Sequence, residues 1–440
     1  MTRPLSLWAA RRDEIWTQFA AGSMRLALRP LHAMIAAPTL LFLAALLGML
    51  LHHPDVRLYE INRITFGLLL VGVAGRAVVC RQRVFVLERA SWPMMGLTLL
   101  AMASIIRLPF EAETWSLLAS KFAVPFIVFH LARLVFTEEK RLRQFEMFAL
   151  AVLAYLSFTA IAFLVGAHAL IFPRFILDES LGIHVERARG PFLQAVANGV
   201  SLNLLGLLAL HAYRRGRARG VKIVVLLASV PIAILATMTR AVWLSFAGTV
   251  VALIFLSKSR TLRRAGMGLA VVVGAGLAVV LSSPSLERTL SDRLTDSGPV
   301  EFRQLVYAGG WQMFLERPLT GWGFNQMPAE LPRYVADGPD KVLYPHNTYL
   351  EVLVEGGVAG LALYLWLMWE LLRLGRGAIP ACERKGFLDQ EFHRLWPILL
   401  AVYWVNAAVV VMNYYFVNCL LFTMAGMLAA QGRRAETGRP

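Results

Sequence analysis

The sequence predicts an all-α polytopic membrane protein with about twelve transmembrane helices. The 440-residue chain is 58% hydrophobic, only 16% of its residues are charged, and its mean hydropathy is +0.58, whereas about a quarter of the residues in soluble domains are charged. Its apolar residues form runs of about the 20 residues that a spanning helix needs. Lys and Arg gather in alternate connections between these runs. The same composition excludes a disordered chain, a coiled coil and a disulfide scaffold.

Each apolar run is interpreted as one helix that crosses the membrane. We expect nine such helices in residues 1–283, after a basic N-terminal segment, and three more in 348–440, before a short tail. Between them, 284–347 forms a loop of 64 residues with amphipathic helical character around 301–316. The predicted spans are 31–51, 64–80, 91–107, 115–136, 144–169, 191–213, 221–238, 241–257, 265–283, 348–372, 395–413 and 416–430.

The positive charge of the chain reports its orientation. The net charge is +16, and 28 of the 44 Lys and Arg residues lie in the two terminal segments and every second connection. Cytoplasmic connections are the ones that carry excess Lys and Arg. We therefore expect both termini in the cytoplasm and the long loop on the outer face. The charge distribution argues against nucleic acid as a partner and allows contact with anionic membrane lipids.

The sequence lacks the common signatures of nucleotide and metal use. It contains no GxxxxGK[ST] loop, no GxGxxG after a strand, no HExxH, and no Cys/His cluster with zinc spacing. Asp337 and Asp340 form only an isolated acidic pair. We expect an enzyme of the outer face that needs no cofactor and no metal, so the energy for its reaction must come from an activated substrate.

Cationic residues lie near the outer ends of several predicted helices. Arg is suited to bidentate phosphate binding, and several Arg together can neutralise a diphosphate without a metal. Arg240 stands between the seventh and eighth spans, and Arg303 begins the amphipathic segment. In the alternative interpretation, each side chain extends to lipid phosphate instead. The cationic candidates are Arg187, Arg189, Arg240, Arg303 and Lys121.

His346 is the best candidate for a catalytic base, because a neutral imidazole at the mouth of the tenth span can accept a proton at neutral pH. Asn347 and Tyr349 follow it and are candidate substrate contacts, although interfacial aromatics are common in membrane proteins. Gly356 and Gly360 form a GxxxG pair that predicts close helix packing. Other histidines near the outer rim, such as His184, are interpreted as ordinary surface residues.

Three segments of the chain resemble the O-antigen ligase/polymerase family of bacterial inner membranes. The first is Thr239-Arg240-Ala241-Val242-Trp243-Leu244, in which Thr239 stands where family members usually have Ser. The second runs from Arg303 through Trp311 to Arg317-Pro318-Leu319-Thr320-Gly321-Trp322-Gly323, and the third is His346-Asn347-Thr348-Tyr349-Leu350 with Glu355-Gly356-Gly357. Together they cover about 230–370, and the first 180 residues carry no matching motif.

The resemblance implies a membrane-embedded glycosyltransferase with a GT-C type of fold and its active site facing the periplasm. The donor would be a glycan on undecaprenyl diphosphate, and the acceptor a sugar hydroxyl of the lipid A–core of lipopolysaccharide. In this interpretation His346 is the base of an inverting reaction, and Arg240 and Arg303 hold the diphosphate with help from Arg187 or Arg189. An O-antigen polymerase, a protein O-oligosaccharyltransferase and a twelve-span transporter remain as alternatives. The oligomeric state is not predicted, and a monomer is compatible with the sequence.

Overall fold

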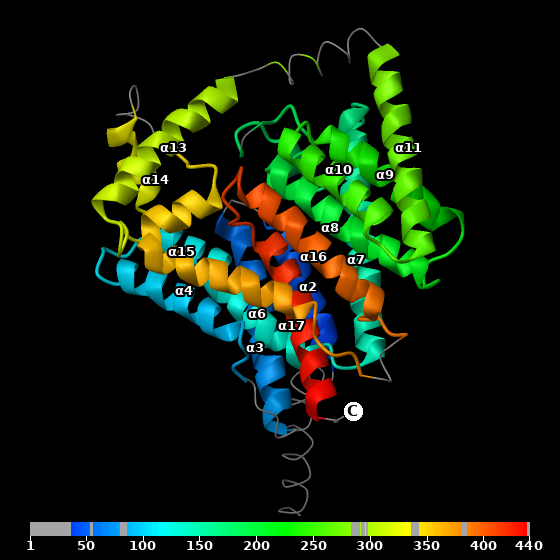
Figure 1. Cartoon of the computed structure of the whole chain (residues 1–440), viewed down its shortest axis with the longest axis horizontal. Coiled ribbons are helices and arrows are strands. Elements are labelled where there is room, and N and C mark those ends of the chain that lie inside the picture. Colours follow the sequence, from blue (N-terminus) through cyan, green and yellow to red (C-terminus); the bar gives the residue numbers. More distant parts are fainter. Residues whose placement is uncertain are drawn as a thin grey trace, which may run out of the picture.

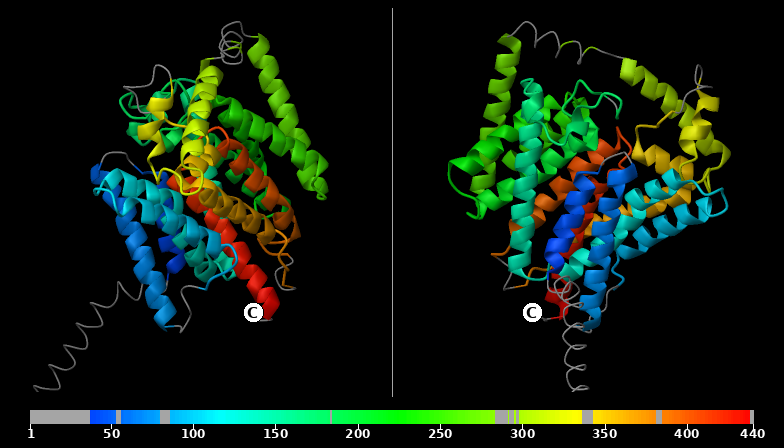
Figure 2. Two further views of the ribbon diagram at one scale, coloured as in Figure 1. Left: turned by 60° about the vertical axis from the view of Figure 1, so that its left-hand side comes forward. Right: turned by 180° about the vertical axis from the view of Figure 1, so that it is seen from behind.

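The structure is a computed structural model that describes residues 37–52, 56–79, 86–182, 184–282, 298–335, 343–380 and 385–437, together with the isolated positions 291 and 295. The predicted basic N-terminal segment and the pair Asp337–Asp340 lie outside these residues. Within the described ranges the regular secondary structure is helical, with no strand. Figures 1 and 2 show the helices gathered into one bundle, with α11 and α13 extending at the end opposite the C terminus.

A helix coincides with each of the twelve apolar runs. They are α2 (Pro38–Leu50), α3 (Val56–Val79), α4 (Ser91–Ile105), the continuous α5–η1–α6 (Ala112–Leu118, Ala119–Ala123, Val124–Val135), α7 (Glu139–Leu164), α8 (Ala195–Arg214), α9 (Val221–Ala236), α10 (Arg240–Phe255), α11 (Arg260–Ser282), α15 (Thr348–Leu374), α16 (Gln390–Ala407) and α17 (Tyr415–Thr437).

Six stretches among the described residues are long and apolar enough to cross a membrane, and four further apolar helices are shorter. The chain is therefore a helical, multi-pass membrane protein; twelve crossings remain a prediction. The six are Asn62–Val79, Ala112–Val135, Glu139–Leu164, Ala195–Arg214, Thr348–Leu374 and Tyr415–Glu436.

Helices α8 and α17 form the centre of the bundle. Both are apolar around nearly their whole circumference, a pattern that favours burial on all sides, and their spanning windows are 94% and 89% buried. α17 packs along α6, while α8 packs against α7, α9 and α16. The core of the bundle therefore lies around these two helices, and the connections between helices lie at its two ends.

The basic connections meet at one end of the bundle. Arg215 after α8 lies 2.6 Å from Glu139 at the start of α7, and Arg434 of α17 donates to the carbonyl of Thr137 over 2.7 Å. Arg133 at the end of α6 lies 2.7 Å from Glu88. The grouping agrees with the alternation seen in the sequence, while the direction of the bundle in the membrane stays a prediction.

The described part of the long loop also contains helices. It contains α13 (Gly298–Glu316), α14 (Met327–Glu330) and η5 (Leu331–Tyr334), so the helix predicted around 301–316 is confirmed. Val306 and Met313 of α13 are buried with Met327, Leu331 and Val354 in a small apolar core. This core holds α13 against the first part of α15.

Helix α15 is broken at Gly357, where the backbone takes φ 62° and ψ −163°, and Figure 1 shows its two segments. The break was not predicted. It removes helical hydrogen bonds, which at membrane depth must be replaced from within the protein. Residues 318–323 replace them: Trp322 N donates to Val354 O and Gly323 N to Glu355 O, each over 2.9 Å, and the Pro318 carbonyl accepts from Val358 N over 2.8 Å.

The GxxxG prediction for α15 agrees with the packing. A Cβ atom on Gly356 or Gly360 would lie 3.4 or 3.6 Å from Cδ2 of Leu100, which belongs to α4. The two glycines therefore face a neighbouring helix closely, even though the break at Gly357 separates them. Residues 318–323 thus bind to this junction, and α4 packs beside it.

Candidate functional site

Four of the eight candidate residues line one cavity of about 200 Å³. They come from separate elements: Arg187 from the connection before α8, Arg240 from the start of α10, Arg303 from α13, and His346 from the residues just before α15. Each side chain is partly buried. The remaining lining residues are His184, Val196, Met238, Thr239, Ala241, Phe302 and Val409.

The turn between α9 and α10 positions Arg240. Met238 adopts a positive φ of 46°, and Thr239 Oγ1 donates to the carbonyl of Thr237 over 2.8 Å. Trp243, in the first turn of α10, donates its indole N–H to Ile234 O over 3.1 Å. These contacts hold the first residue of α10 beside the cavity and give Thr239 and Trp243 structural roles next to Arg240.

Arg303 and Tyr307 lie on the same face of α13, because residues four apart are neighbours on a helix. The Tyr307 hydroxyl lies 3.4 Å from the carbonyl oxygens of His346 and Ala408. Tyr307 therefore connects the helix that carries Arg303 to the segment that carries His346. Tyr307 is not among the residues predicted for the site; its position four residues after Arg303 was the available signal.

His346 has a left-handed backbone, with φ 47°, a conformation that non-glycine residues adopt rarely and often at functional sites. Asn347 follows as the N-cap of α15, and its side-chain oxygen accepts from the N–H groups of Tyr349 and Leu350 over 3.0 and 3.1 Å. Thr348 Oγ1 donates to Val410 O over 2.8 Å. The imidazole is thus presented by a capped helix end that is tied to the segment after α16.

The surroundings of His346 favour the neutral imidazole. Burial lowers the pKa of His346 below its usual value, and the nearby Arg303 and His184 lower it further. A ring with a lowered pKa is unprotonated at neutral pH and can accept a proton. The protonation state therefore fits the role of a base.

Arg189 contributes to the architecture of the connection and does not line the cavity. It is 1% exposed, and its guanidinium donates to the main-chain carbonyls of Ile176, Asp178 and Leu181. Ala188, which lies between Arg189 and Arg187, is held as well, because its N–H donates to Ala236 O over 3.0 Å. The sequence placed Arg189 with Arg187 in one cationic group, but the backbone of Arg189 is in the αR region, with φ −81° and ψ −13°, and its side chain binds carbonyl groups of its own connection instead of lining the cavity.

Three further candidates do not line the shared cavity: Lys121, Asn347 and Tyr349. Lys121 is buried in the π-helical turn η1 and forms an ion pair with Glu351 of α15. Tyr349 donates to the carbonyl of Trp404 over 3.1 Å, and Asn347 caps its helix. Their positions depend on how α5–η1–α6 and α16 pack against α15, which the sequence does not reveal.

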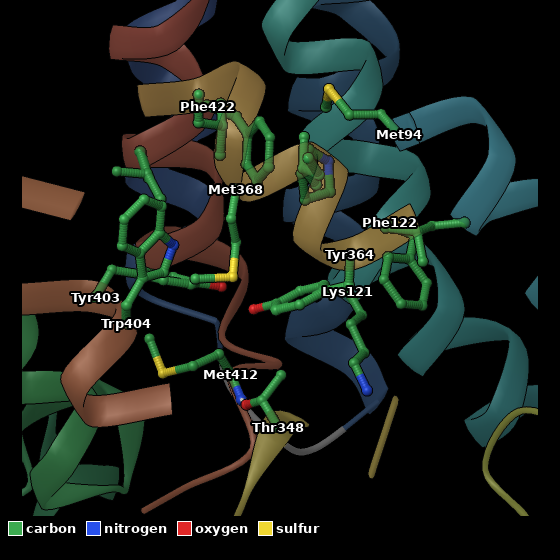
Figure 3. A pocket seen from close by; sticks show the side chains of 15 residues that line it. Met94, Lys121, Phe122, Thr348, Tyr364, Met368, Tyr403, Trp404, Met412 and Phe422 are labelled. Atoms are coloured by element: carbon green, nitrogen blue, oxygen red, sulfur yellow. The ribbon is translucent and has the colours of Figure 1, made fainter. Parts of the chain in front are cut away.

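A second, smaller cavity of about 40 Å³ lies beside Lys121 and Thr348. Figure 3 shows its methionine and aromatic side chains, among them Met368, Tyr364 and Trp404, with Lys121 and Thr348 at one side. It is mainly apolar. It holds only a few water-sized volumes, so it is too small for a glycan or a long lipid chain.

The shared cavity can bind an anion and accept a proton. Three guanidinium groups line it together with an imidazole whose pKa is lowered. Among the described residues, no group of three or more His, Cys, Asp and Glu side chains is placed to hold a metal ion. His184, interpreted from the sequence as a surface residue, also lines the cavity; its position three residues before Arg187 was the available signal.

Residues 223–365 match the family model described as O-antigen ligase. The matched range begins in α9 and ends in α15, so it contains Arg240, Arg303 and His346, while Arg187 precedes it. No curated protein matches the chain.

Proposed function

Because this match supports assignment to the O-antigen ligase/polymerase family, whose members are glycosyltransferase-like enzymes, we propose that the chain is an O-antigen ligase. It transfers a glycan from undecaprenyl diphosphate to a sugar hydroxyl of lipid A–core, and so completes lipopolysaccharide. The reaction takes place at the periplasmic face of the bacterial inner membrane, within a GT-C type of fold. Both termini lie in the cytoplasm.

The convergence of Arg187, Arg240, Arg303 and His346 on one cavity carries this proposal. A glycosyl diphosphate needs cations at the leaving group, where negative charge grows as the bond breaks, and a base at the attacking hydroxyl. Guanidinium groups supply the first without proton transfer. The lowered pKa of His346 supplies the second.

The proposed reaction is a single displacement with inversion. His346 takes the proton of the acceptor hydroxyl as its oxygen attacks the anomeric carbon. The bond from that carbon to the phosphate oxygen breaks, and undecaprenyl diphosphate leaves with the bonding electrons, held by Arg240, Arg303 and Arg187. The prenyl chain stays in the membrane between helices, and no metal or other cofactor takes part.

The test is transfer in vitro. Purified protein is mixed with undecaprenyl-diphosphate-linked glycan and lipid A–core in the presence of EDTA and without nucleotide. We expect glycan-capped lipid A–core from the wild type and none from His346→Ala. His168→Ala is the matched control, because His168 is exposed in the short helix η2 (His168–Leu170) and does not line the cavity.

Other products would contradict the ligase assignment. Longer donor-linked chains would identify a polymerase that uses the same donor site, and glycosylated protein would identify a protein O-oligosaccharyltransferase. Normal transfer by His346→Ala would exclude His346 as the base. No product from a well-folded wild type would favour a transporter.

A further inference from the structure

His184 and Glu186 form a second ionisable pair at the cavity. His184 lines it, and its Nδ1 lies 3.4 Å from Oε1 of Glu186. The same carboxylate oxygen accepts from Nε of Arg187 over 3.1 Å. One carboxylate therefore lies beside both the imidazole and the guanidinium that this connection brings to the cavity.

The backbone that carries the pair is held firmly in place. Arg187 N donates to His184 O over 3.1 Å, which closes a turn between them. Beyond it, the Ala188 carbonyl accepts from Nδ2 of Asn198 over 2.8 Å, and Arg189 is buried among carbonyl groups of the same connection. His184 itself has a positive φ of 58°. These hydrogen bonds favour one arrangement of the backbone at His184 and Arg187, which lowers the entropy that a ligand must pay to order them.

We propose that His184 is a cationic ligand-binding residue of this site, which in its protonated form donates a hydrogen bond to the diphosphate of a polyprenyl diphosphate, with Glu186 as its positioning residue. Because Nδ1 lies beside Glu186, the proposed donor to the diphosphate is Nε2. The inference rests on the proposed function for the identity of the ligand. No covalent step is added, because His184 binds charge and His346 accepts the proton.

The charges around His184 decide when it is protonated. Glu186 on its own loop favours the cation, whereas Arg187, Arg240 of α10, Arg303 of α13 and, when protonated, His346 disfavour it. A bound diphosphate reverses this balance, since it brings at least two negative charges into the cavity. Binding of the ligand and protonation of His184 therefore favour each other.

The experiment measures binding of undecaprenyl diphosphate to the purified full-length protein between about pH 6 and 9, the range in which imidazole titrates. It uses the His346→Gln background, so that His184 is the one histidine among the described cavity residues that remains. The added variants are His184→Gln and His184→Arg, with His168→Gln as the matched control. The ligand's own titration is common to all of them.

We expect Kd for the parent to rise as the pH increases and His184 loses its proton. His184→Gln should bind about 10- to 100-fold more weakly near neutral pH, the usual range for a hydrogen bond to a charged group, and should lack that pH-dependent rise. His184→Arg should bind tightly across the range, because its charge is permanent. Glu186→Gln should weaken binding less than His184→Gln does, and His168→Gln should match the parent.

Equal affinity of His184→Gln and the parent would overturn the inference, as would a pH-dependent rise that persists in His184→Gln. An affinity of His184→Arg no better than that of His184→Gln would overturn it too. Because the readout is binding, it is independent of transfer. Loss of the ligase function with an intact His184 effect would contradict the acceptor and the reaction, while active transfer without the effect would contradict only this inference.

Discussion

Gly357→Ala tests the idea that the break in α15 positions the site. The φ of 62° and ψ of −163° at Gly357 lie in a region that is accessible almost only to glycine and costs other residues about 1–3 kcal/mol. A Cβ atom there would lie 2.3 Å from Leu319 O and 2.8 Å from Pro318 O. Moving the neighbouring atoms to make room costs about 1–3 kcal/mol more. The substitution should therefore lower the stability of the folded protein by about 2–6 kcal/mol.

The expected result is a lower Tm in detergent and a lower kcat for glycan transfer. Residues 318–323 follow α13, which carries Arg303, and bind to α15, which begins beside His346. The rate should fall because the substitution disturbs this attachment. Gly356→Ala is the control: its Cβ would have no contact closer than 3.4 Å, with Leu100 Cδ2. Helix propensity then changes stability by about 1 kcal/mol or less. Equal Tm and kcat for the two variants would refute the reasoning.

Three further predictions follow from the same contacts. Removing the charge in Arg303→Gln should let the pKa of His346 rise toward its usual value, so the acidic limb of the residual kcat/KM, which reports the free enzyme, should move to higher pH; an unmoved limb would count against the coupling. Lys121→Met should destabilise the protein by about 3–5 kcal/mol by leaving Glu351 buried without its partner, whereas Lys121→Met/Glu351→Met should regain most of this stability. Thermal unfolding measures both changes, and a double variant no more stable than Lys121→Met would contradict the prediction. Arg189→Ala should lower Tm, because it removes hydrogen bonds of a charged group worth about 3 kcal/mol or more. Weaker binding of the lipid-linked glycan at an unchanged Tm would instead indicate that Arg189 contacts this substrate directly.

Much of the fold follows from local properties that a sequence displays directly. Hydropathy over a window of about 20 residues marks the helices, because apolar surface must face lipid or the bundle core whichever helix lies beside it. The helix at 301–316 and the close packing at Gly356 were predicted on similar local grounds. Arg240, Arg303 and His346 could be chosen as candidates because Arg suits phosphate binding, imidazole can accept a proton at neutral pH, and all three lie in the segments that resemble the family.

What the sequence does not contain is the direction of each side chain and its partners across the bundle. Arg187 and Arg189 are two residues apart and chemically identical, yet one lines the cavity and the other is buried among carbonyl groups of its own loop. In the sequence His184 resembles other rim histidines, and only the structure shows that it lines the same cavity as His346. The amino-acid types and their hydrophobic pattern thus determined the helices and the chemistry available. The membership of the site was decided by tertiary packing, because packing brings residues more than 100 positions apart in the sequence, such as Arg187 and Arg303, to one cavity.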